Sequence, residues 1–437
     1  MWRLAWRAYR GVSGLQFWIL RRFTPAGLLV LGVAILAAVF GVNTNQNVAY
    51  RVFTFLFALL ALSVLAARLM RGSFEVTRHL PRAVAIGDEF EYRLVLRNLG
   101  KRKADGITVH EELADPRPAF AEFRARLTTP TFGNWKDLVE RRRIAGVAVA
   151  PVPVLDANGN THGKTNEGTE LRVRGRAYRR GRVHFTGCSV ALSDPFGLFR
   201  KIVTLPEEAN LLVLPRRYRL PPLPLPGSRM YQQGGVTLAS AVGDSEEFIG
   251  LREYRPGDPL QKIHWKSFAR TGEPVVREYQ DEFFERHALI LDTFAGAAEE
   301  RSFEEAVAIA ASFAYTIDTQ DCLLDLMFVG AETYTYTAGR GQLQTGTLLE
   351  VLAGVQPCAD KPFRVLHDAA LAKRGALSGC ICILVRWDKE RRAFIDDLHA
   401  CGVTTRVLVV SERAIADRPP WLTVLEPGKI QEGLASL

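Results

Sequence analysis

The side chains best suited to chemistry gather in one charged segment, residues 247–278, where acidic and basic residues alternate. Within it, His264 together with Asp258 or Glu253 could supply a general base and the carboxylate that orients it. The sequence places no nucleophile beside this histidine, and the chain contains no G-x-S-x-G, H-E-x-x-H or P-loop motif. We therefore expect a protein that is not an enzyme, and a hydrolase that uses His264 is the alternative.

The same segment is rich in Arg, Trp and Tyr, the residue types that dominate protein interfaces. Pro256-Gly257-Asp258-Pro259 is typical of a turn, and Asp258 is placed to cap a short helix after it. The alternating charges also allow a structural interpretation, a set of internal ion pairs that holds the segment together. The residues expected to bind a partner are Arg252, Glu253, Tyr254, Arg255, Asp258, His264, Trp265, Lys266 and Arg270.

Two more acids, Asp292 and Asp388, each lie at or near the end of an apolar run that is typical of a buried strand. Ligands of parallel sheets lie beyond the carboxyl ends of the strands, so we expect these carboxylates to approach one another. The alternative role of Asp292 is to cap a helix.

These acids need an α/β domain to position them, and the pattern of residues 286–437 predicts one with a mainly parallel sheet. A capping box, Ser302 with Glu305, predicts the start of its first helix. Cys380 and Cys382 share one face of a strand and are expected to be core residues. Expected strands cover 287–292, 323–329, 380–385 and 407–410, and further helices cover 347–355, 364–376 and 389–400.

Residues 73–219 instead show the period of two that is typical of strands with one solvent-exposed face. In 89–97, apolar residues occupy alternate positions and charges occupy most of the sites between them. We expect a small antiparallel β-sandwich similar to an immunoglobulin module.

Two features of the connecting regions resemble known sites. Residues 156–167 place oxygen-bearing side chains at calcium-loop spacing, but Thr161 replaces the turn glycine and Lys164 puts a cation at a ligand position, which favours a plain loop. Residues 220–285 combine a proline-rich linker, 220–227, with the charged segment. The linker is expected to act as a spacer, with a PxxP ligand as the alternative.

The first 72 residues predict a transmembrane hairpin. Residues 25–42 and 52–67 lack charged side chains, and a polar turn of Asn, Thr and Gln separates them. Residues 1–72 also hold eight arginines and no acidic residue, which leaves a net charge of only +1 on the other 365 residues. We therefore expect a lipid bilayer as a partner and no nucleic-acid binding. A buried helical hairpin is the alternative.

The arginines of this region also predict its orientation. Five precede the first apolar stretch, two follow the second, and only Arg51 lies between them. The positive-inside rule then places both termini in the cytoplasm, with a double pass through the membrane. The six cysteines of the soluble part are expected to be reduced thiols.

The chain resembles the bacterial family known as domain of unknown function 58. The resemblance is carried by Leu-Arg-Glu-Tyr at 251–254, Pro-Gly-Asp at 256–258, His-Trp at 264–265 and Ala-Arg-Thr-Gly at 269–272. Asp-Pro-Phe-Gly-Leu-Phe at 194–199 adds to it. The family implies a membrane-anchored protein whose C-terminal domain is similar to von Willebrand factor A.

The resemblance also implies partners and a metal site. The family is associated with MoxR-type AAA+ ATPases and with other von Willebrand A proteins, which suggests an adaptor or assembly role at the membrane. A scaffold for envelope assembly whose β-domain binds a protein or ligand is the alternative. In the metal motif Asp-x-Ser-x-Ser, Asp292 matches the first position, Phe294 and Gly296 replace the serines, and Asp388 is the candidate distant acid. We therefore expect this Mg²⁺ site to be degenerate.

Overall fold

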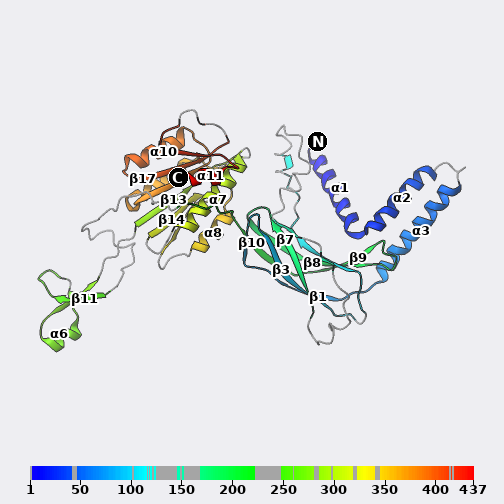
Figure 1. Ribbon diagram of the computed structural model, residues 1–437, viewed down its shortest axis with the longest axis horizontal. Helices are drawn as coiled ribbons and strands as arrows, with labels where there is room; N and C mark the ends of the chain where they lie inside the picture. The colour runs from blue at the N-terminus through cyan, green and yellow to red at the C-terminus, as the bar shows by residue number, and fades with distance from the viewer. Residues whose placement is uncertain are drawn as a thin grey trace. The chain divides into compact units, whose positions relative to one another are not determined.

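The structure, a computed structural model, describes residues 2–41, 47–100, 103–115, 117, 119–120, 123–124, 145–147, 150–151, 168–221, 248–258, 260–279, 285–296, 299–317, 322–339, 345–412, 415 and 418–437. The chain divides into two compact units. The first comprises residues 1–216 with 350–354, and the second comprises residues 217–349 with 355–437 (Figure 1). The candidate calcium loop at 156–167 and most of the proline-rich linker lie outside the described residues.

Three helices open the first unit: α1 (Trp2–Arg22), α2 (Pro25–Gly41) and α3 (Asn47–Leu69). Residues 48–69 of α3 are long and apolar enough to cross a membrane, as expected. At about 1.5 Å per residue, α2 is about 25 Å long, slightly less than a typical hydrocarbon core. Helices α2 and α3 pack together as a hairpin through Ala34 and Leu60 (Figure 1). The sequence analysis did not predict α1.

Two β-sheets follow, as the alternating pattern predicts. One has the order β1-β3-β7-β5, and the other has the order β2-β10-β8-β4-β6 with β9 also paired to β8. The pairings are antiparallel except for β2 with β10. The strands are β1 (Phe74–His79), β2 (Ala83–Ala85), β3 (Glu89–Asn98), β4 (Ile107–Leu113), β5 (Ala145–Val147), β6 (Ala150–Pro151), β7 (Thr169–Ala177), β8 (Gly181–Ser193), β9 (Arg200–Leu205) and β10 (Ala209–Leu214).

The two sheets share one apolar core, to which β3 and β8 both contribute buried side chains. A charged pair lies inside this core. The guanidinium of Arg78 on β1 contacts both oxygens of Glu111 on β4, at 3.2 and 2.5 Å, and Tyr92 donates to the same carboxylate at 2.8 Å. Burial, followed by the nearby Glu111 charge, raises the pKa of Tyr92. These contacts link the sheets by charge as well as by packing.

The 194–199 loop joins this β-domain to the helices. The Asp194 carboxylate accepts hydrogen bonds from the backbone N–H groups of residues 196, 198 and 199 at 2.7–3.0 Å and from the Ser63 hydroxyl of α3 at 2.8 Å. Leu198 packs with the apolar contact between α2 and α3. A Cβ at Gly27 would lie 1.9 Å from the Leu198 carbonyl oxygen, so only glycine allows this approach.

Thr24 completes the junction between α1 and α2. Its hydroxyl accepts from the backbone N–H of Gly27 at 3.0 Å and donates to the carbonyl of Gly197 at 2.6 Å. Thr24 therefore caps α2, with Pro25 as the first helical residue.

The second unit contains a six-stranded sheet of order β15-β14-β13-β16-β17-β18. All its pairs are parallel except β14 with the edge strand β15. The strands are β13 (Glu285–Leu291), β14 (Cys322–Val329), β15 (Thr333–Ala338), β16 (Gly379–Leu384), β17 (Thr404–Val410) and β18 (Leu422–Leu425). The predicted strands are confirmed, and β15 and β18 were missed.

Along the chain, this sheet is accompanied by the helices α7 (Glu300–Thr316), α8 (Thr345–Gly354), α9 (Arg364–Ala372), α10 (Lys389–Ala400) and α11 (Ile430–Ala435). Residues 350–354 of α8 are assigned to the first unit. The chain moves from β13 through α7 toward one edge and from β16 through α10 toward the other. Since such crossovers are right-handed, α7 and α10 cover opposite faces of the sheet (Figure 1). The predicted capping box is wrong: Ser302 lies buried inside α7, and the N-cap position is Glu299.

The structure divides the chain at residue 216, slightly before the predicted boundary at 219. The Tyr218 backbone N–H donates to Ser312 Oγ at 2.8 Å and its hydroxyl donates to Glu305 at 2.5 Å. Residues 217–219 thus pack on α7 and belong to the second unit.

The buried Asp194 should be essential for the junction between the β-domain and the helices. In the Asp194→Ala variant, three backbone N–H groups lose their acceptor. At about 1–3 kcal/mol for each unsatisfied donor, we expect a loss of at least about 3 kcal/mol in the free energy of unfolding. Ser63→Ala should cost about 1 kcal/mol, because it removes one bond and leaves the loop intact.

Thermal unfolding of the detergent-purified protein would measure both effects. The exposed Glu208→Gln variant is the control and should unfold like the wild type. Equal stability of Asp194→Ala and the wild type would contradict this account of the loop.

Candidate functional site

The first candidate site lies where the strand order of the α/β sheet reverses. Strands β13 and β16 are neighbours, yet the chain leaves them toward opposite edges of the sheet. Ligands of open α/β sheets bind in the crevice that forms at this point. Asp292 directly follows β13, and Asp388 follows β16 after three residues. The sequence-based expectation that the two acids converge is confirmed.

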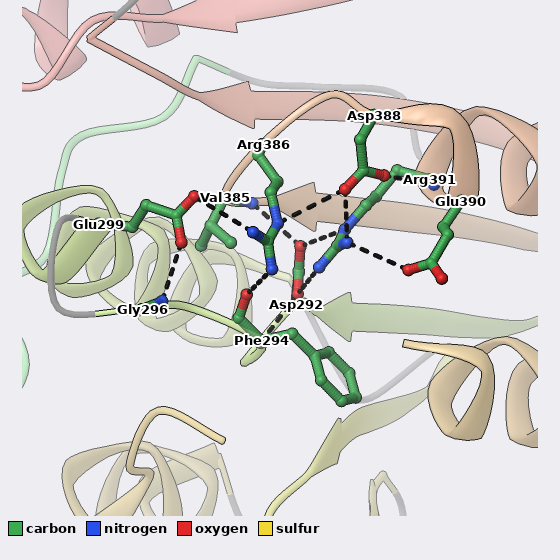
Figure 2. Close-up of polar contacts among 9 residues, drawn as sticks. All are labelled: Asp292, Phe294, Gly296, Glu299, Val385, Arg386, Asp388, Glu390 and Arg391. Atoms are coloured by element: carbon green, nitrogen blue, oxygen red, sulfur yellow. Dashed lines mark hydrogen bonds and ion pairs between the residues drawn. The ribbon is translucent and has the colours of Figure 1, made fainter. Parts of the chain in front are cut away.

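Both acids contact one guanidinium, that of Arg391 on α10 (Figure 2). Arg391 Nε and Nη2 donate to the two oxygens of Asp292 at 3.1 and 3.2 Å, and Nη1 donates to Asp388 at 2.8 Å. Asp292 and the Arg391 side chain are almost fully buried, whereas Asp388 is partly exposed. The Cζ atom of Arg391 lies over the Phe363 ring, 4.2 Å from its centre, a favourable cation–π contact.

Asp292 has further donors. Its oxygens accept from the backbone N–H groups of Phe294 at 3.0 Å and Val385 at 3.3 Å. Burial raises the pKa of this carboxyl above its ordinary value, while the Arg391 charge and the backbone donors act in the opposite direction. Asp292 is not a helix cap, since α7 begins only at Glu300. Asp388 is the residue with that role, because its side chain accepts from the backbone N–H of Arg391 at the start of α10.

A second arginine surrounds this centre. Arg386 donates to the Phe294 carbonyl oxygen at 2.8 Å and lies 3.5 Å from both Glu299 and Asp388 (Figure 2). Glu299 in turn accepts from the backbone N–H of Gly296 at 2.8 Å. The loops after β13 and β16 are therefore joined by ion pairs and backbone hydrogen bonds.

This donor set does not fit a metal ion. Both Asp292 oxygens are occupied by N–H donors, and Phe294 and Gly296 stand where the resemblance would require hydroxyl ligands. The described residues contain no cluster of three or more His, Cys, Asp or Glu side chains that could hold a metal. The guanidinium of Arg391 lies between the two acids expected to bind Mg²⁺. The thiols of Cys380 and Cys382 are also unsuitable ligands, since burial raises the pKa of both, that of Cys380 to about 12.

The second candidate site is the charged segment, which folds as a β-hairpin of β11 (Phe248–Glu253) and β12 (Val275–Tyr279). Between these strands lie the 3₁₀ turn η2 (Leu260–Lys262) and helix α6 (Trp265–Thr271). Ile263 and Val276 are its buried apolar side chains among the described residues. Gly272 ends α6 with a φ of 75°, which favours glycine.

An ion pair closes the loop after β11. Arg252 Nη1 and Nη2 donate to the two oxygens of Asp258, each at 2.7 Å, and the backbone N–H of Arg255 donates at 2.9 Å. The Arg252 guanidinium and this backbone bond lower the pKa of Asp258 to about 2. The prediction that Asp258 caps the helix is wrong, because the N-cap residue of α6 is His264. For this pair, the alternative of internal ion pairing is correct.

His264 bonds to a residue that the sequence analysis did not single out. Its Nδ1 lies 2.7 Å from Ser267 Oγ, one helical turn later. Asp258, one of the two carboxylates that could orient a catalytic His264, instead binds Arg252. A serine three residues after a histidine N-cap is a local helix-start contact, and it does not supply the third group that would orient a catalytic histidine.

The other predicted partner-binding residues divide by exposure. Glu253, Arg255, Trp265, Lys266 and Arg270 are exposed, while Tyr254 and His264 are half-buried. Trp265 and Phe268 are in edge-to-face contact, with ring centres 6.0 Å apart. The structure adds exposed apolar side chains that were not among the predicted partner-binding residues: Leu251, Leu260 and Phe268.

Sequence analysis also missed Arg391, the residue that organises the first site. The sequence feature that could have indicated it is the spacing Asp-x-x-Arg of Asp388 and Arg391 at the start of a predicted helix. Residues at i and i+3 lie on one helix face, so this spacing predicts a contact between the two side chains. Nothing in the sequence indicates that this side chain turns inward to a strand end almost a hundred positions earlier.

Residues 250–375 match the family described as "Protein of unknown function DUF58", so the chain carries a DUF58 domain there. Over 176 residues the chain is 25% identical to the uncharacterized protein YeaD of Bacillus subtilis (strain 168). That alignment covers 40% of this chain and 42% of YeaD, so the chain spans less than half of the length of this distant relative.

Two solved structures show weak similarity to parts of this chain. A part of E. coli alpha-2-macroglobulin gives a TM-score of 0.20 at 11% identity, over 36% of this chain and 8% of that one. The CARDB domain of PF1109 from Pyrococcus furiosus gives 0.17 at 9% identity, over 33% of this chain and 89% of that one. Neither similarity supports an argument about function.

The geometry predicts that the Asp292–Arg391 pair is essential for folding of the α/β unit. The Arg391→Met variant leaves a buried carboxylate without its cation, which typically costs about 3–5 kcal/mol. The double variant Asp292→Asn/Arg391→Met removes both charges and should recover part of this loss. Saturating Mg²⁺ should leave the free energy of unfolding of the wild type unchanged.

Denaturant unfolding of the full-length protein in detergent would provide these measurements. Lys389→Met, an exposed position on the same helix, is the matched control and should change stability by less than about 0.5 kcal/mol. A large Mg²⁺-dependent stabilisation that disappears in Asp292→Ala would show that a metal occupies the site after all.

Proposed function

We propose that this DUF58-domain protein is a membrane-anchored, non-enzymatic adaptor or assembly protein that presents the β11–β12 hairpin to a MoxR-type AAA+ ATPase. The observation that carries the proposal is the exposed apolar surface of the hairpin. Leu260 and Trp265 are 64% and 58% exposed and lie among the charged residues of the same segment. An apolar centre with a charged rim is the usual composition of a protein-binding surface.

The internal contacts of the hairpin support the same conclusion. The Arg252–Asp258 pair, the strand pairing and the Gly272 turn hold this small segment in shape with few buried apolar side chains. A surface that is ordered before it meets its partner loses less conformational entropy on binding. The polar groups of the segment therefore position the apolar ones, which provide the affinity.

We further infer that the α/β part is a von Willebrand factor A-like domain that works without a metal ion. Its sheet order, its antiparallel edge strand and the acid after its first strand support this assignment. Arg391 would supply the positive charge that Mg²⁺ supplies in a complete site. Recognition of a partner would then be independent of divalent cations.

The anchor in this proposal is the α2–α3 hairpin, which would cross the inner membrane twice with both termini in the cytoplasm. The exposed apolar side chains of both helices and the arginines at their outer ends support this arrangement. Partners and other von Willebrand A proteins would then meet the protein at the inner leaflet.

Binding to a purified MoxR-type ATPase from the same cell tests the hairpin surface. Trp265→Ala should weaken binding by about tenfold or more, because an exposed tryptophan at the centre of an interface is a typical hot spot. Trp421→Ala, which removes another exposed tryptophan of the second unit, should leave the affinity within about twofold. Equal binding by wild type and Trp265→Ala would refute this surface.

Cysteine labelling in intact cells tests the double pass. Thr44→Cys lies in the polar turn between the two apolar stretches and should react with a membrane-impermeant maleimide added outside. The native Cys401 is exposed in the structure and should react only after lysis. Labelling of Cys401 in intact cells would place the second unit outside and contradict the orientation.

A further inference from the structure

Helix α1 has three chemically distinct faces. Its first residues follow a helical period in which positions three or four apart share a face. Trp6 and Tyr9 form an aromatic face, while Arg3, Arg7 and Arg10 form a basic face. Leu4, Ala8, Val12 and Leu15 form an aliphatic face.

The aromatic face already has a partner in the same unit. Tyr9 stacks on Phe123 with ring centres 5.5 Å apart, and Trp6 contacts Phe120 at 6.0 Å. The other end of the helix is fixed too. The Arg21 guanidinium donates two hydrogen bonds to the Glu112 carboxylate of β4, one of them 2.9 Å long. Helix α1 is therefore held in a defined orientation about its own axis.

The aliphatic face remains open to the surroundings. Leu4, Val12 and Leu15 are 70%, 64% and 59% exposed. Such a row of aliphatic side chains is unfavourable in water, because the free-energy cost grows with the apolar surface that stays hydrated. Something apolar must cover it in the functional protein.

The position of α1 in the chain indicates what covers this face. Only Phe23 and Thr24 separate its last residue from α2, the first helix of the proposed anchor. Helix α1 turns away from α2 instead of continuing its axis (Figure 1). If α2 enters the bilayer, the adjoining end of α1 lies at the level of the lipid headgroups.

The charges of α1 complement that surface. The helix carries five arginines and no acidic residue. Basic residues close to a membrane are attracted to anionic lipids, and their long side chains reach headgroups while apolar neighbours enter the acyl region. A basic helix with an exposed aliphatic row next to an anchor has the composition of an interfacial helix.

We propose that α1 lies on the inner leaflet, with Leu4, Val12 and Leu15 inserted among the acyl chains and with Arg3 and Arg7 bound to anionic phospholipid headgroups. This inference rests on the proposed membrane anchor. Because α1 also contacts the β-domain through Trp6 and Tyr9, lipid binding by α1 would set the orientation of that domain on the membrane.

Depth-dependent fluorescence quenching in proteoliposomes tests the proposal on the full-length protein. A nitrobenzoxadiazole label is attached at a single Val12→Cys, in a background where Cys358 and Cys401, the half-buried and exposed native thiols, are replaced by serine. Ser13→Cys is the matched control, because this neighbouring position lies on the Tyr9 face. Phe55→Cys in α3 reports the anchor itself.

In vesicles of phosphatidylglycerol and phosphatidylcholine, nitroxide-labelled lipids should quench the Val12 label at least about threefold more than the Ser13 label. Arg3→Gln/Arg7→Gln should reduce the Val12 quenching by about half or more, and so should pure phosphatidylcholine. Each variant is compared with the wild type in thermal unfolding, so that misfolded protein is not scored.

The outcomes separate the two proposals. If the Phe55 label is quenched while the Val12 label behaves like the Ser13 label, α1 does not lie in the interface and this inference is wrong. If the Phe55 label itself escapes quenching, the anchor fails and the inference fails with it. Equal Val12 quenching in charged and uncharged vesicles would refute the role of anionic lipids.

Discussion

A carboxylate that loses its water must receive hydrogen-bond donors from the protein, and this constraint shapes both units. Asp292 and Asp194 are both buried, and each is surrounded by N–H or O–H donors from separate parts of the chain. Asp292 joins β13 to α10 through Arg391, while Asp194 joins the 194–199 loop to α3 through Ser63. Removing either acid would leave several donors without an acceptor.

The same constraint explains why the acid at the strand end does not make a metal site. A metal ion and a guanidinium compete for the same carboxylate oxygens, and here the guanidinium belongs to Arg391 of the same chain. Arg391 is also fixed by Asp388 and by the Phe363 ring, so it cannot leave without the loss of three favourable contacts. The acid therefore contributes to stability at a place where related sheets bind ligands.

Regular elements could be predicted because their periodicity is local. In residues 89–97 the apolar side chains alternate because one face of the strand is buried. On α10 the apolar residues recur every three or four positions because one face of the helix is buried. Strand β15 was missed because Thr333–Ala338 is a polar and aromatic edge strand without a buried run. Helix α1 was missed because its arginines indicate membrane topology and are not in themselves a helix signal.

Contacts between distant residues could not be predicted in the same way. Asp292 and Asp388 were identified because both follow strands, and parallel topology brings strand ends together. Arg391 was not identified, because a charged residue on a helix is normally exposed and its burial depends on a partner ninety-nine positions away. Ser63 and Asp194 likewise meet only because a loop of the β-domain packs between two helices.

These buried contacts also decide which surfaces remain for function. In the described residues, most of the conspicuous polar side chains, among them Asp292, Asp194, Glu111 and Asp258, are engaged with other groups of the same chain. Groups that hold the fold are poor candidates for catalysis, since a reacting group must be free to exchange protons or ligands. The exposed features that stand out are apolar: the aliphatic row of α1, and Leu260 and Trp265 in the hairpin. Exposed apolar side chains are typical of surfaces that bind lipid or protein, so the proposed partner and lipid binding rests on these residues.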